Sequence, residues 1–341
     1  MPEAGPDGAD PDGADPDGAD PDGADRSLRP PAVAALRRAV LRWGGAHRRD
    51  LPWRSTREPW PILVSEVMLQ QTQVSRVEPH YRRFVARFPT VRSCAGARLA
   101  DVLAVWQGLG YNRRAANLHR AASAMVAHHD GRVPDDLHAL QALPGVGSYT
   151  ARAVLSLAFG RDVGAVDTNV ARLLARAVAG RPLSRSESQR LADELVPAGR
   201  SWEFNQTLFD LGARYCTGAR PDCGTCPLRR SCRWAAAGHP QPDPALRTAG
   251  TSRPQAAFAG SDRQGRGRLV TALIAGPVPV SRLASTAGWP GDHERARAVA
   301  GRLVADGLAG WDGDHLALPV RPGGVPGPST GLATGPDTAR R

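Results

Sequence analysis

The chain of 341 residues contains no lysine, so all 44 of its basic residues are arginines. This absence excludes covalent chemistry through a lysine amine, which forms Schiff bases with carbonyl and sugar carbons. Arginine is well suited to phosphate because its planar guanidinium makes paired hydrogen bonds. A genome biased toward arginine codons would also explain the missing lysine, so the absence alone does not identify a function.

Long apolar runs are also missing from the sequence. No stretch approaches the roughly 20 apolar residues that a membrane span needs, and the first residues lack the charged-then-apolar pattern of a signal peptide. We therefore expect no membrane partner and a cytoplasmic, nucleoid-associated protein. Cysteines remain reduced in that compartment, so a cluster of them indicates a metal site more often than disulfides.

Negative charge is scarce outside the first residues. Nine of the 33 acidic residues precede Arg26, so the remaining chain has 44 arginines against 24 acids, a net charge of +20. A polyanion is the leading partner for such a body, and double-stranded DNA is the natural candidate. Residues 6–25 repeat PDGAD four times, a composition that cannot form a core. We predict disordered tails at 1–28 and 321–341; the acidic tail either competes with DNA or is inert.

The body of the chain is predicted to be all-α. Apolar residues recur at helical spacing over 32–47, 60–88, 99–106 and 114–128, and the Pro-Asp-Asp sequence at 134–136 is typical of a helix start. Residues 235–262 are rich in alanine, proline and glycine and are interpreted as a linker. Residues 263–320 combine helical segments with a strand pair around an Asp-Gly turn, which predicts a small winged-helix-like module that binds DNA or packs on the body.

Four of the five cysteines lie within seventeen residues, spaced Cys216-x6-Cys223-x2-Cys226-x5-Cys232. Zinc sites usually combine two close cysteine pairs that are well separated in sequence, whereas this segment has one close pair. A compact loop around a [4Fe-4S] cluster, which takes four thiolates, fits the spacing better. Zinc remains the alternative. Cys94 lies outside the pattern and is expected to be a buried small side chain.

The sequence LPGVGSYTA, from Leu143 to Ala151, predicts a tight turn between two helices. Gly145 and Gly147 leave backbone N–H groups unobstructed at a helix start, where they can bind a phosphate. Ser148 is a candidate cap for the second helix. An isolated Gly-Val-Gly is usually only a turn.

Two carboxylates stand out by their surroundings. Glu66 is surrounded by apolar residues in a helical segment, and burial raises the pKa of a carboxyl group, as a general acid requires. Asp167, in AVDTNV, directly precedes a predicted helix. The plain alternatives are a glutamate on a polar helix face and an ordinary N-cap.

The segment from Leu51 to Arg233 resembles the endonuclease III and adenine glycosylase superfamily, and within it the A/G-specific adenine glycosylases of the MutY type. The motifs are SEVMLQQTQV, LPWR, GLGY, FNQTLFDLGA, the LPGVGSYTA turn and the four-cysteine loop. The resemblance implies a helix–hairpin–helix DNA glycosylase fold. Residues 59–164 would form a six-helix domain and residues 29–58 with 165–234 the iron–sulfur cluster domain. It also implies that the cluster braces an arginine loop against DNA and that the protein acts as a monomer on adenine mispairs.

The resemblance assigns roles residue by residue. Glu66 becomes the acid that protonates adenine and manages the attacking water, and Asp167 stabilises the sugar cation. Gln71 and Tyr111 would wedge into the duplex beside the opposite base, although core packing is the plain alternative for Tyr111. The remaining substrate- and DNA-binding positions would be Arg54, Leu69, Thr72, Val74, Gly145, Gly147, Tyr149 and Asn169. Tyr149 occupies the position of the lysine that cuts the strand in endonuclease III-type enzymes, which implies a monofunctional glycosylase without AP-lyase activity.

The match fails in two places. Residues after Trp234 do not resemble the Nudix-like domain usual in the family, and Asn112 stands where a second tyrosine is common. These departures concern recognition of 8-oxoguanine opposite the adenine. They do not concern the removal of adenine itself, which the resemblance places in base excision repair. Two alternatives remain: a glycosylase for oxidised pyrimidines or T:G mismatches, and a non-enzymatic iron–sulfur regulator that senses redox state.

Overall fold

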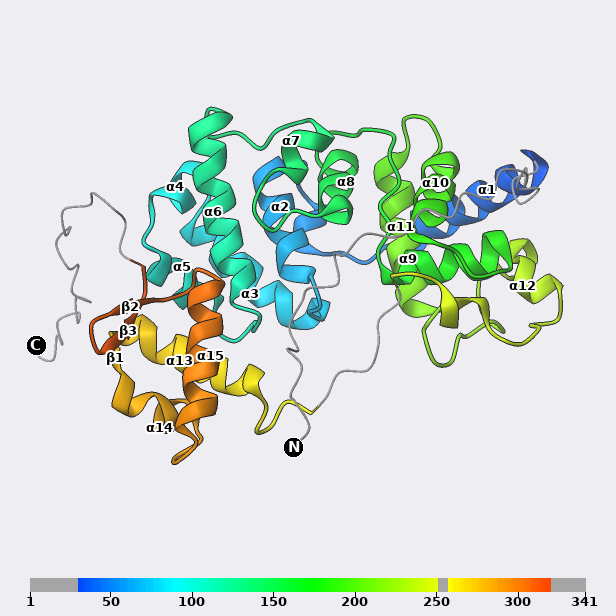
Figure 1. The fold of residues 1–341 in the computed structure, drawn as a ribbon. Coiled ribbons are helices and arrows are strands. Elements are labelled where there is room, and N and C mark those ends of the chain that lie inside the picture. Colours follow the sequence, from blue (N-terminus) through cyan, green and yellow to red (C-terminus); the bar gives the residue numbers. More distant parts are fainter. Residues whose placement is uncertain (1–29, 251–256, 320–341) are drawn as a thin grey trace, which may run out of the picture.

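The apolar side chains gather into two cores, one on each side of a cleft. The computed structural model describes residues 30–250 and 257–319, and these residues are mostly helical (Figure 1). This confirms the all-α prediction. The two predicted disordered tails lie outside the described residues.

The first core is built by helices from the middle of the sequence. At its centre Phe84 packs edge-on against Trp106 and tilted against Phe88, with ring centroids 5.9 and 5.1 Å away. The predicted helical stretch from Trp60 to Phe88 is two helices, broken at Gln70–Gln73. The region has seven helices, one more than expected: α2 (Pro59–Leu69), α3 (Val74–Arg87), α4 (Val91–Gly96), α5 (Leu99–Trp106), α6 (Arg113–His128), α7 (Leu137–Gln141) and α8 (Ser148–Leu157).

The second core joins the start of the described chain to residues beyond 165. Helix α1 packs along α11, which also contacts α9. Helix α9 continues directly into the wider π-helical turn η2, which ends at Gly180 in a left-handed conformation (φ +68°). The elements are α1 (Pro30–His47), η1 (Pro52–Arg54), α9 (Thr168–Leu173), η2 (Leu174–Ala179), α10 (Arg185–Leu195), α11 (Ser201–Arg214), η3 (Arg229–Ser231), α12 (Arg233–Ala236) and η4 (Pro244–Arg247).

The helix–hairpin–helix consists of α7, a tight turn and α8. Gly145 has φ +78°, and a Cβ there would lie 2.6 Å from Cβ of Asn117, so both its conformation and the close packing require glycine. The predicted cap at Ser148 is wrong. Gly147 occupies the N-cap position in an extended conformation, Ser148 is the first helical residue, and no side chain caps the helix.

The C-terminal module follows the order helix, strand, helix, helix, strand, strand, which is that of a winged helix. Leu316 of β3 pairs with Val278 of β1 on one side and Trp311 of β2 on the other, giving the antiparallel sheet β1-β3-β2. Its elements are α13 (Asp262–Ala275), β1 (Val278–Pro279), η5 (Val280–Arg282), α14 (Leu283–Ala287), α15 (His293–Ala305), β2 (Gly310–Asp312) and β3 (His315–Ala317).

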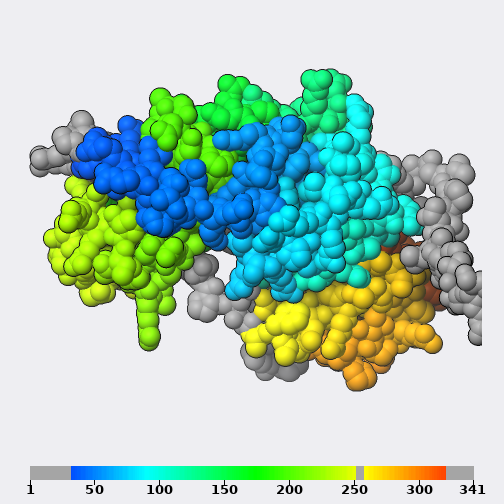
Figure 2. All heavy atoms as spheres, turned by 180° about the vertical axis from the view of Figure 1, so that it is seen from behind, coloured from blue at the N-terminus to red at the C-terminus, as the bar shows by residue number. Residues whose placement is uncertain are grey.

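The module packs directly on the first core. Helix α13 contacts α5, and the apolar side chains of both parts form one continuous cluster. Seen from behind, the yellow and orange module lies against the cyan helices of the first core (Figure 2). The preceding segment was predicted to be a linker. Within it, Ala245 is buried, and the Ala249 N–H donates to the Leu183 carbonyl over 3.0 Å.

None of the described helices is both long enough and apolar enough to cross a bilayer.

Close packing of α11 on α9 leads to a prediction for Gly212→Ala. A Cβ at Gly212 would lie 2.8 Å from Cβ and 2.9 Å from the carbonyl oxygen of Asn169, so α9 has to move. We expect a loss of about 1–3 kcal/mol in the free energy of unfolding, as for other overpacked cores. The matched control is Gly45→Ala in α1, where no atom lies within 4 Å. Alanine is the better helix former, so this change is expected to stabilise by about 0.5–1 kcal/mol. Thermal melting of both variants tests this prediction. Equal changes in melting temperature for the two variants would contradict it.

Candidate active site

A cleft of about 1230 Å³ lies between the two cores. Its walls come from the end of α2, the start of α8, the residues leading into α9, and α11. The structure brings nine of the predicted site residues to this cleft: Arg54, Glu66, Leu69, Gln71, Thr72, Val74, Tyr149, Asp167 and Asn169. Tyr111, Gly145 and Gly147 lie outside its lining. Tyr111 is 38% exposed with φ +49°, which excludes core packing as its role.

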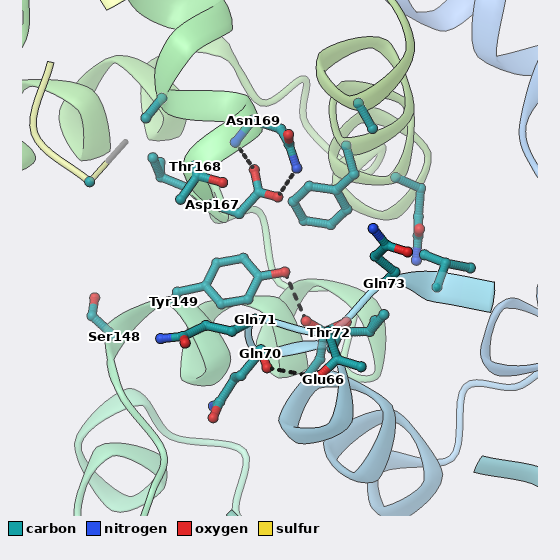
Figure 3. A pocket seen from close by; sticks show the side chains of 18 of the residues that line it. Glu66, Gln70, Gln71, Thr72, Gln73, Ser148, Tyr149, Asp167, Thr168 and Asn169 are labelled. Atoms are coloured by element: carbon teal, nitrogen blue, oxygen red, sulfur yellow. Dashed lines mark hydrogen bonds between the residues drawn. The ribbon is translucent and has the colours of Figure 1, made fainter. Parts of the chain in front are cut away.

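Glu66 is almost completely buried, with 3% of its surface exposed. Helix α2 places it there because nearly every side chain of this helix is buried, so a carboxylate on α2 has no water-facing side. Burial raises the pKa of Glu66 to about 7, and the negative charge of Asp167 adds to the rise. The Tyr149 hydroxyl donates a 2.8 Å hydrogen bond to Glu66 Oε2, which opposes the rise (Figure 3). Near neutral pH this carboxyl group can therefore give up or take back a proton.

Asp167 reaches into the cleft from the wall opposite Glu66 (Figure 3). It is the N-cap of α9: Oδ1 accepts from the N–H groups of Asn169 and Val170, over 2.9 and 2.7 Å. The Asn169 side chain donates to Oδ2 over 2.7 Å. Burial raises the pKa of Asp167, and these donors oppose the rise because they favour the charged form. The capping alternative is thus correct, and it holds the carboxylate at the cleft.

Arg172 extends this network to the cysteine loop. Its guanidinium donates to Asn169 Oδ1 over 2.7 Å and to the Cys216 carbonyl over 3.1 Å. Asp167 is therefore connected through two side chains to the first cysteine of the loop. Arg172 lies in an ordinary helical stretch, so no sequence pattern singles it out.

Arg54 is held in place by a buried partner that the sequence analysis missed. Asp210 of α11 accepts two hydrogen bonds from its guanidinium, of 2.7 and 3.0 Å, and both side chains are buried. Nε of Arg54 is buried and makes no hydrogen bond within the described residues. Buried donors are nearly always satisfied, so this unpaired N–H is an exception in the described part of the chain. Asp210 lies inside the FNQTLFDLGA motif, and this motif is the sequence feature that could have identified it.

Arg114 connects the two loops that carry Gln71 and Tyr111. Its guanidinium donates to the carbonyls of Met68, Gln70 and Gly110 and to the Thr72 hydroxyl, over 2.6–3.2 Å. It also lies over the Tyr111 ring, 5.5 Å from the centroid. Burial lowers the pKa of Arg114 to about 10, which leaves it charged at neutral pH. Gln71 has φ +55°, so both wedge candidates have left-handed backbones stabilised by one arginine.

The four cysteines line one cavity beside η2. Yet no three metal-binding side chains among the described residues come close enough to hold a single ion. Arg176, from η2, orders the loop by donating to the carbonyls of Thr217 and Gly218, over 2.7 and 3.1 Å, and by pairing with Asp243. The exposed arginines on and beside the loop are Arg220, Arg229, Arg230 and Arg233.

Comparisons with known proteins agree with this geometry. Residues 64–198 match the family model of the HhH-GPD superfamily base excision DNA repair protein. A protein of Mycolicibacterium smegmatis named adenine DNA glycosylase is 43% identical over 274 residues, which cover 79% of this chain and 90% of that protein. The chain belongs to the adenine DNA glycosylase family.

Other members and solved structures extend the adenine DNA glycosylase match. The human protein of that name is 42% identical over 215 residues, covering 59% of this chain and 39% of the human protein. The structure of a thermostable thymine-DNA glycosylase superposes with a TM-score of 0.56 at 30% identity, covering 61% of this chain and 98% of that one. A trapped endonuclease III–DNA intermediate gives 0.54 at 25% identity, covering 62% and 100%. The predicted helix–hairpin–helix glycosylase fold is thereby confirmed.

The raised pKa of Glu66 predicts a pH-dependent stability. Its folded-state pKa of about 7 lies above the ordinary 4.5, so the folded protein binds this proton more tightly than the unfolded chain. The corresponding stability is present below pH 4.5 and is lost as the pH rises through 7, at a cost of about 3 kcal/mol. Glu66→Gln removes the charge and so is expected to melt at a higher temperature than wild type at pH 8, but not at pH 4.5.

The control is Glu78→Gln on α3, where the carboxylate pairs with Arg82 at the surface. It is expected to leave the melting difference between the two pH values unchanged. If Glu66→Gln behaves like this control, Glu66 is not destabilised by burial.

Proposed function

We propose that this chain removes adenine mispaired with 8-oxoguanine or guanine by hydrolysing the bond between the base and the sugar. The observation that carries the proposal is the buried Glu66, with a pKa near neutrality, facing Asp167 across the cleft. Glycosidic hydrolysis proceeds through an oxocarbenium-like transition state and uses two carboxyl groups in different environments. The printed names of the relatives support adenine as the base.

Glu66 supplies the proton in the first half of the reaction. It transfers the proton to a ring nitrogen of adenine, so the base leaves as a neutral molecule with the electron pair of the broken C1′–N bond. The resulting carboxylate then accepts a proton from the water that attacks C1′. The products are free adenine and an intact strand with an abasic sugar. Tyr149 holds the Glu66 carboxyl group in position throughout.

Asp167 stabilises the positive charge that develops on the sugar. Its carboxylate is fixed by the N–H groups of α9 and by Asn169, so it requires no reorganisation when the charge appears. Arg54, Leu69, Thr72 and Val74 would surround the flipped base. Gly145 and Gly147 would bind a backbone phosphate.

Gln71 and Tyr111 would fill the space that the adenine vacates. Both are exposed at the surface beside the cleft, on loops that Arg114 holds together. Proteins that kink DNA often insert such side chains between bases.

Strand cleavage is not expected. Tyr149 takes the place of the Schiff-base lysine, and its hydroxyl is buried against Glu66, with a pKa raised well above its usual value. Water, rather than a side-chain amine, then attacks the sugar. A redox regulator without enzymatic activity would leave the buried pair of Glu66 and Tyr149 without a purpose.

Cys216, Cys223, Cys226 and Cys232 would hold a [4Fe-4S] cluster. When bound, the cluster ties the loop into one rigid unit. Arg220, Arg229, Arg230 and Arg233 could then face DNA phosphates despite their mutual repulsion.

The catalytic assignment predicts the behaviour of two isosteric variants. Glu66→Gln cannot donate the proton, and Asp167→Asn keeps hydrogen-bonding atoms but loses the charge. Each is expected to slow single-turnover adenine release about a hundredfold or more, with DNA affinity near that of wild type. Duplexes containing A:8-oxoG, A:G, T:G and thymine glycol test the specificity. The proposal fails if wild type removes no adenine, or if Glu66→Gln is fully active.

The missing lysine predicts the fate of the strand. Wild type is expected to leave it intact until alkali is added, and borohydride is expected to trap no protein–DNA adduct. A trapped adduct would contradict the monofunctional assignment.

The cysteine loop predicts the metal content. Protein purified without oxygen is expected to contain iron and sulfide and to be brown. Cys226→Ser is expected to lose the iron, whereas Cys94→Ser, in the first core, is expected to keep it. One zinc per chain with no iron would overturn the assignment.

A further inference from the structure

The winged-helix module has a surface that is poorly suited to bind DNA in the usual way. In helix-turn-helix proteins the second helix of the motif enters the major groove. Here the equivalent helix is α15, and two of its arginines, Arg295 and Arg302, are paired with Asp262 of α13. The β2–β3 turn, which forms the wing, has two exposed aspartates, Asp312 and Asp314. Carboxylates at this tip repel phosphate, so the wing does not fit a DNA backbone.

A different edge of the module lies beside the candidate active site. Arg263, in the first turn of α13, donates from Nη1 to the Tyr111 hydroxyl over 3.4 Å. The same guanidinium lies 5.9 Å from the centroid of the Phe258 ring. Tyr111 and Phe258 are two of only four large hydrophobic side chains that are exposed in the described part of the chain, at 38% and 59%. One arginine therefore connects two exposed aromatic rings across the junction between the first core and the module. We call Tyr111, Arg263 and Phe258 the junction ridge.

The junction ridge is held firmly to the body. Asp306, at the end of α15, pairs with Arg266 of α13 over 2.6 Å and with Arg113 of α6 over 3.5 Å. Its carbonyl oxygen accepts two 3.2 Å hydrogen bonds from Arg120 of α6. Together with the contact of α13 on α5, these bonds fix the start of α13 relative to the Tyr111 loop.

The position of the ridge indicates which part of a duplex it meets. Gln71 lines the cleft that would receive adenine, Arg114 links the loops of Gln71 and Tyr111, and Arg263 and Phe258 lie next to Tyr111 on the module side. The path from the cleft through Gln71 and Tyr111 to the module leads away from the flipped base. Because Gln71 and Tyr111 would lie beside the opposite base, Arg263 and Phe258 would lie next to the strand that carries it. Exposed aromatic rings stack on bases and sugars, and an arginine between them neutralises a phosphate.

We propose that the junction ridge is a DNA-binding site in which Phe258 and Arg263 contact the strand carrying the base opposite the adenine. The module thus contributes to the interface through the start of α13 rather than through α15 and the wing. The proposal rests on the function proposed above and adds two contact residues to it.

The test compares ridge variants with matched variants elsewhere on the module, all in the full chain. Phe258→Ala and Arg263→Gln change the ridge. Trp311→Ala, on β2, and Arg297→Gln, on α15, change an exposed aromatic residue and an exposed arginine on the side used by ordinary winged helices. The probe is a duplex in which a 2′-fluoro adenosine, which resists hydrolysis, lies opposite 8-oxoguanine.

We expect Phe258→Ala to weaken binding about five- to tenfold through the loss of stacking. Arg263→Gln is expected to lower the slope of log Kd against log salt by about 0.9, the value of one phosphate contact. The control variants are expected to bind like wild type. Losses confined to the controls, or ridge variants that equal wild type, would overturn the proposal. Phe258→Leu replaces Phe258→Ala if the latter melts at a lower temperature than wild type.

Neutral methylphosphonates identify the strand. One phosphate at a time is replaced. At one position on the opposite-base strand, the replacement is expected to weaken DNA binding by wild type but not by Arg263→Gln. The same coupling on the adenine strand would overturn the strand assignment. Failure of the proposed function gives a different result, because wild type would then release adenine from no duplex at all. If wild type releases adenine but the ridge variants bind DNA as wild type does, only the proposal for the junction ridge is refuted.

Discussion

A carboxyl group kept out of water is the constraint on which the candidate site depends. Glu66 lies on a helix with almost no exposed side, so its charged form is destabilised wherever the fold is intact. Tyr149 donates a hydrogen bond that offsets part of the cost of this burial. That tyrosine in turn has to be the second residue of α8, directly after the glycine turn, with its ring against Phe209. The hairpin and the acid are therefore parts of one arrangement.

Buried arginines connect segments that are distant in the sequence. Arg54 joins η1 to α11, Arg114 joins α6 to the end of α2, and Arg176 joins η2 to the cysteine loop. Each makes at least three hydrogen bonds in a planar fan, which an ammonium group cannot reproduce. A chain without lysine can thus place its cations inside the protein as well as on its surface. The arginines expected to face DNA are therefore only some of the 44 that the sequence contains.

Much of the architecture could be predicted from the sequence because helical periodicity is a local property. Helix α5 spans the predicted residues, and the strand pair at 310–317 lies where the Asp-Gly turn indicated. Strand β1 and helix α14 were missed because Val278–Pro279 is too short for a pattern and becomes a strand only by pairing with β3. The nine predicted residues that line the cleft were identified from the motifs of the resemblance. Asp210, Arg114 and Arg172 could not be assigned roles, because their functions arise from contacts with segments 40 to 160 residues away.

The attachment of the winged-helix module has a consequence for how solution conditions act on the protein. Asp306 gathers three arginines from two domains, and its carboxylate is partly accessible to water. Charge pairs of this kind weaken as salt screens them. Ionic strength therefore acts in two places: on the attraction between the arginines and a duplex, and on the charge pairs that help to fix the module beside Tyr111. A salt series on this protein therefore weakens two sets of charge pairs at once, one inside the protein and one between the protein and a duplex.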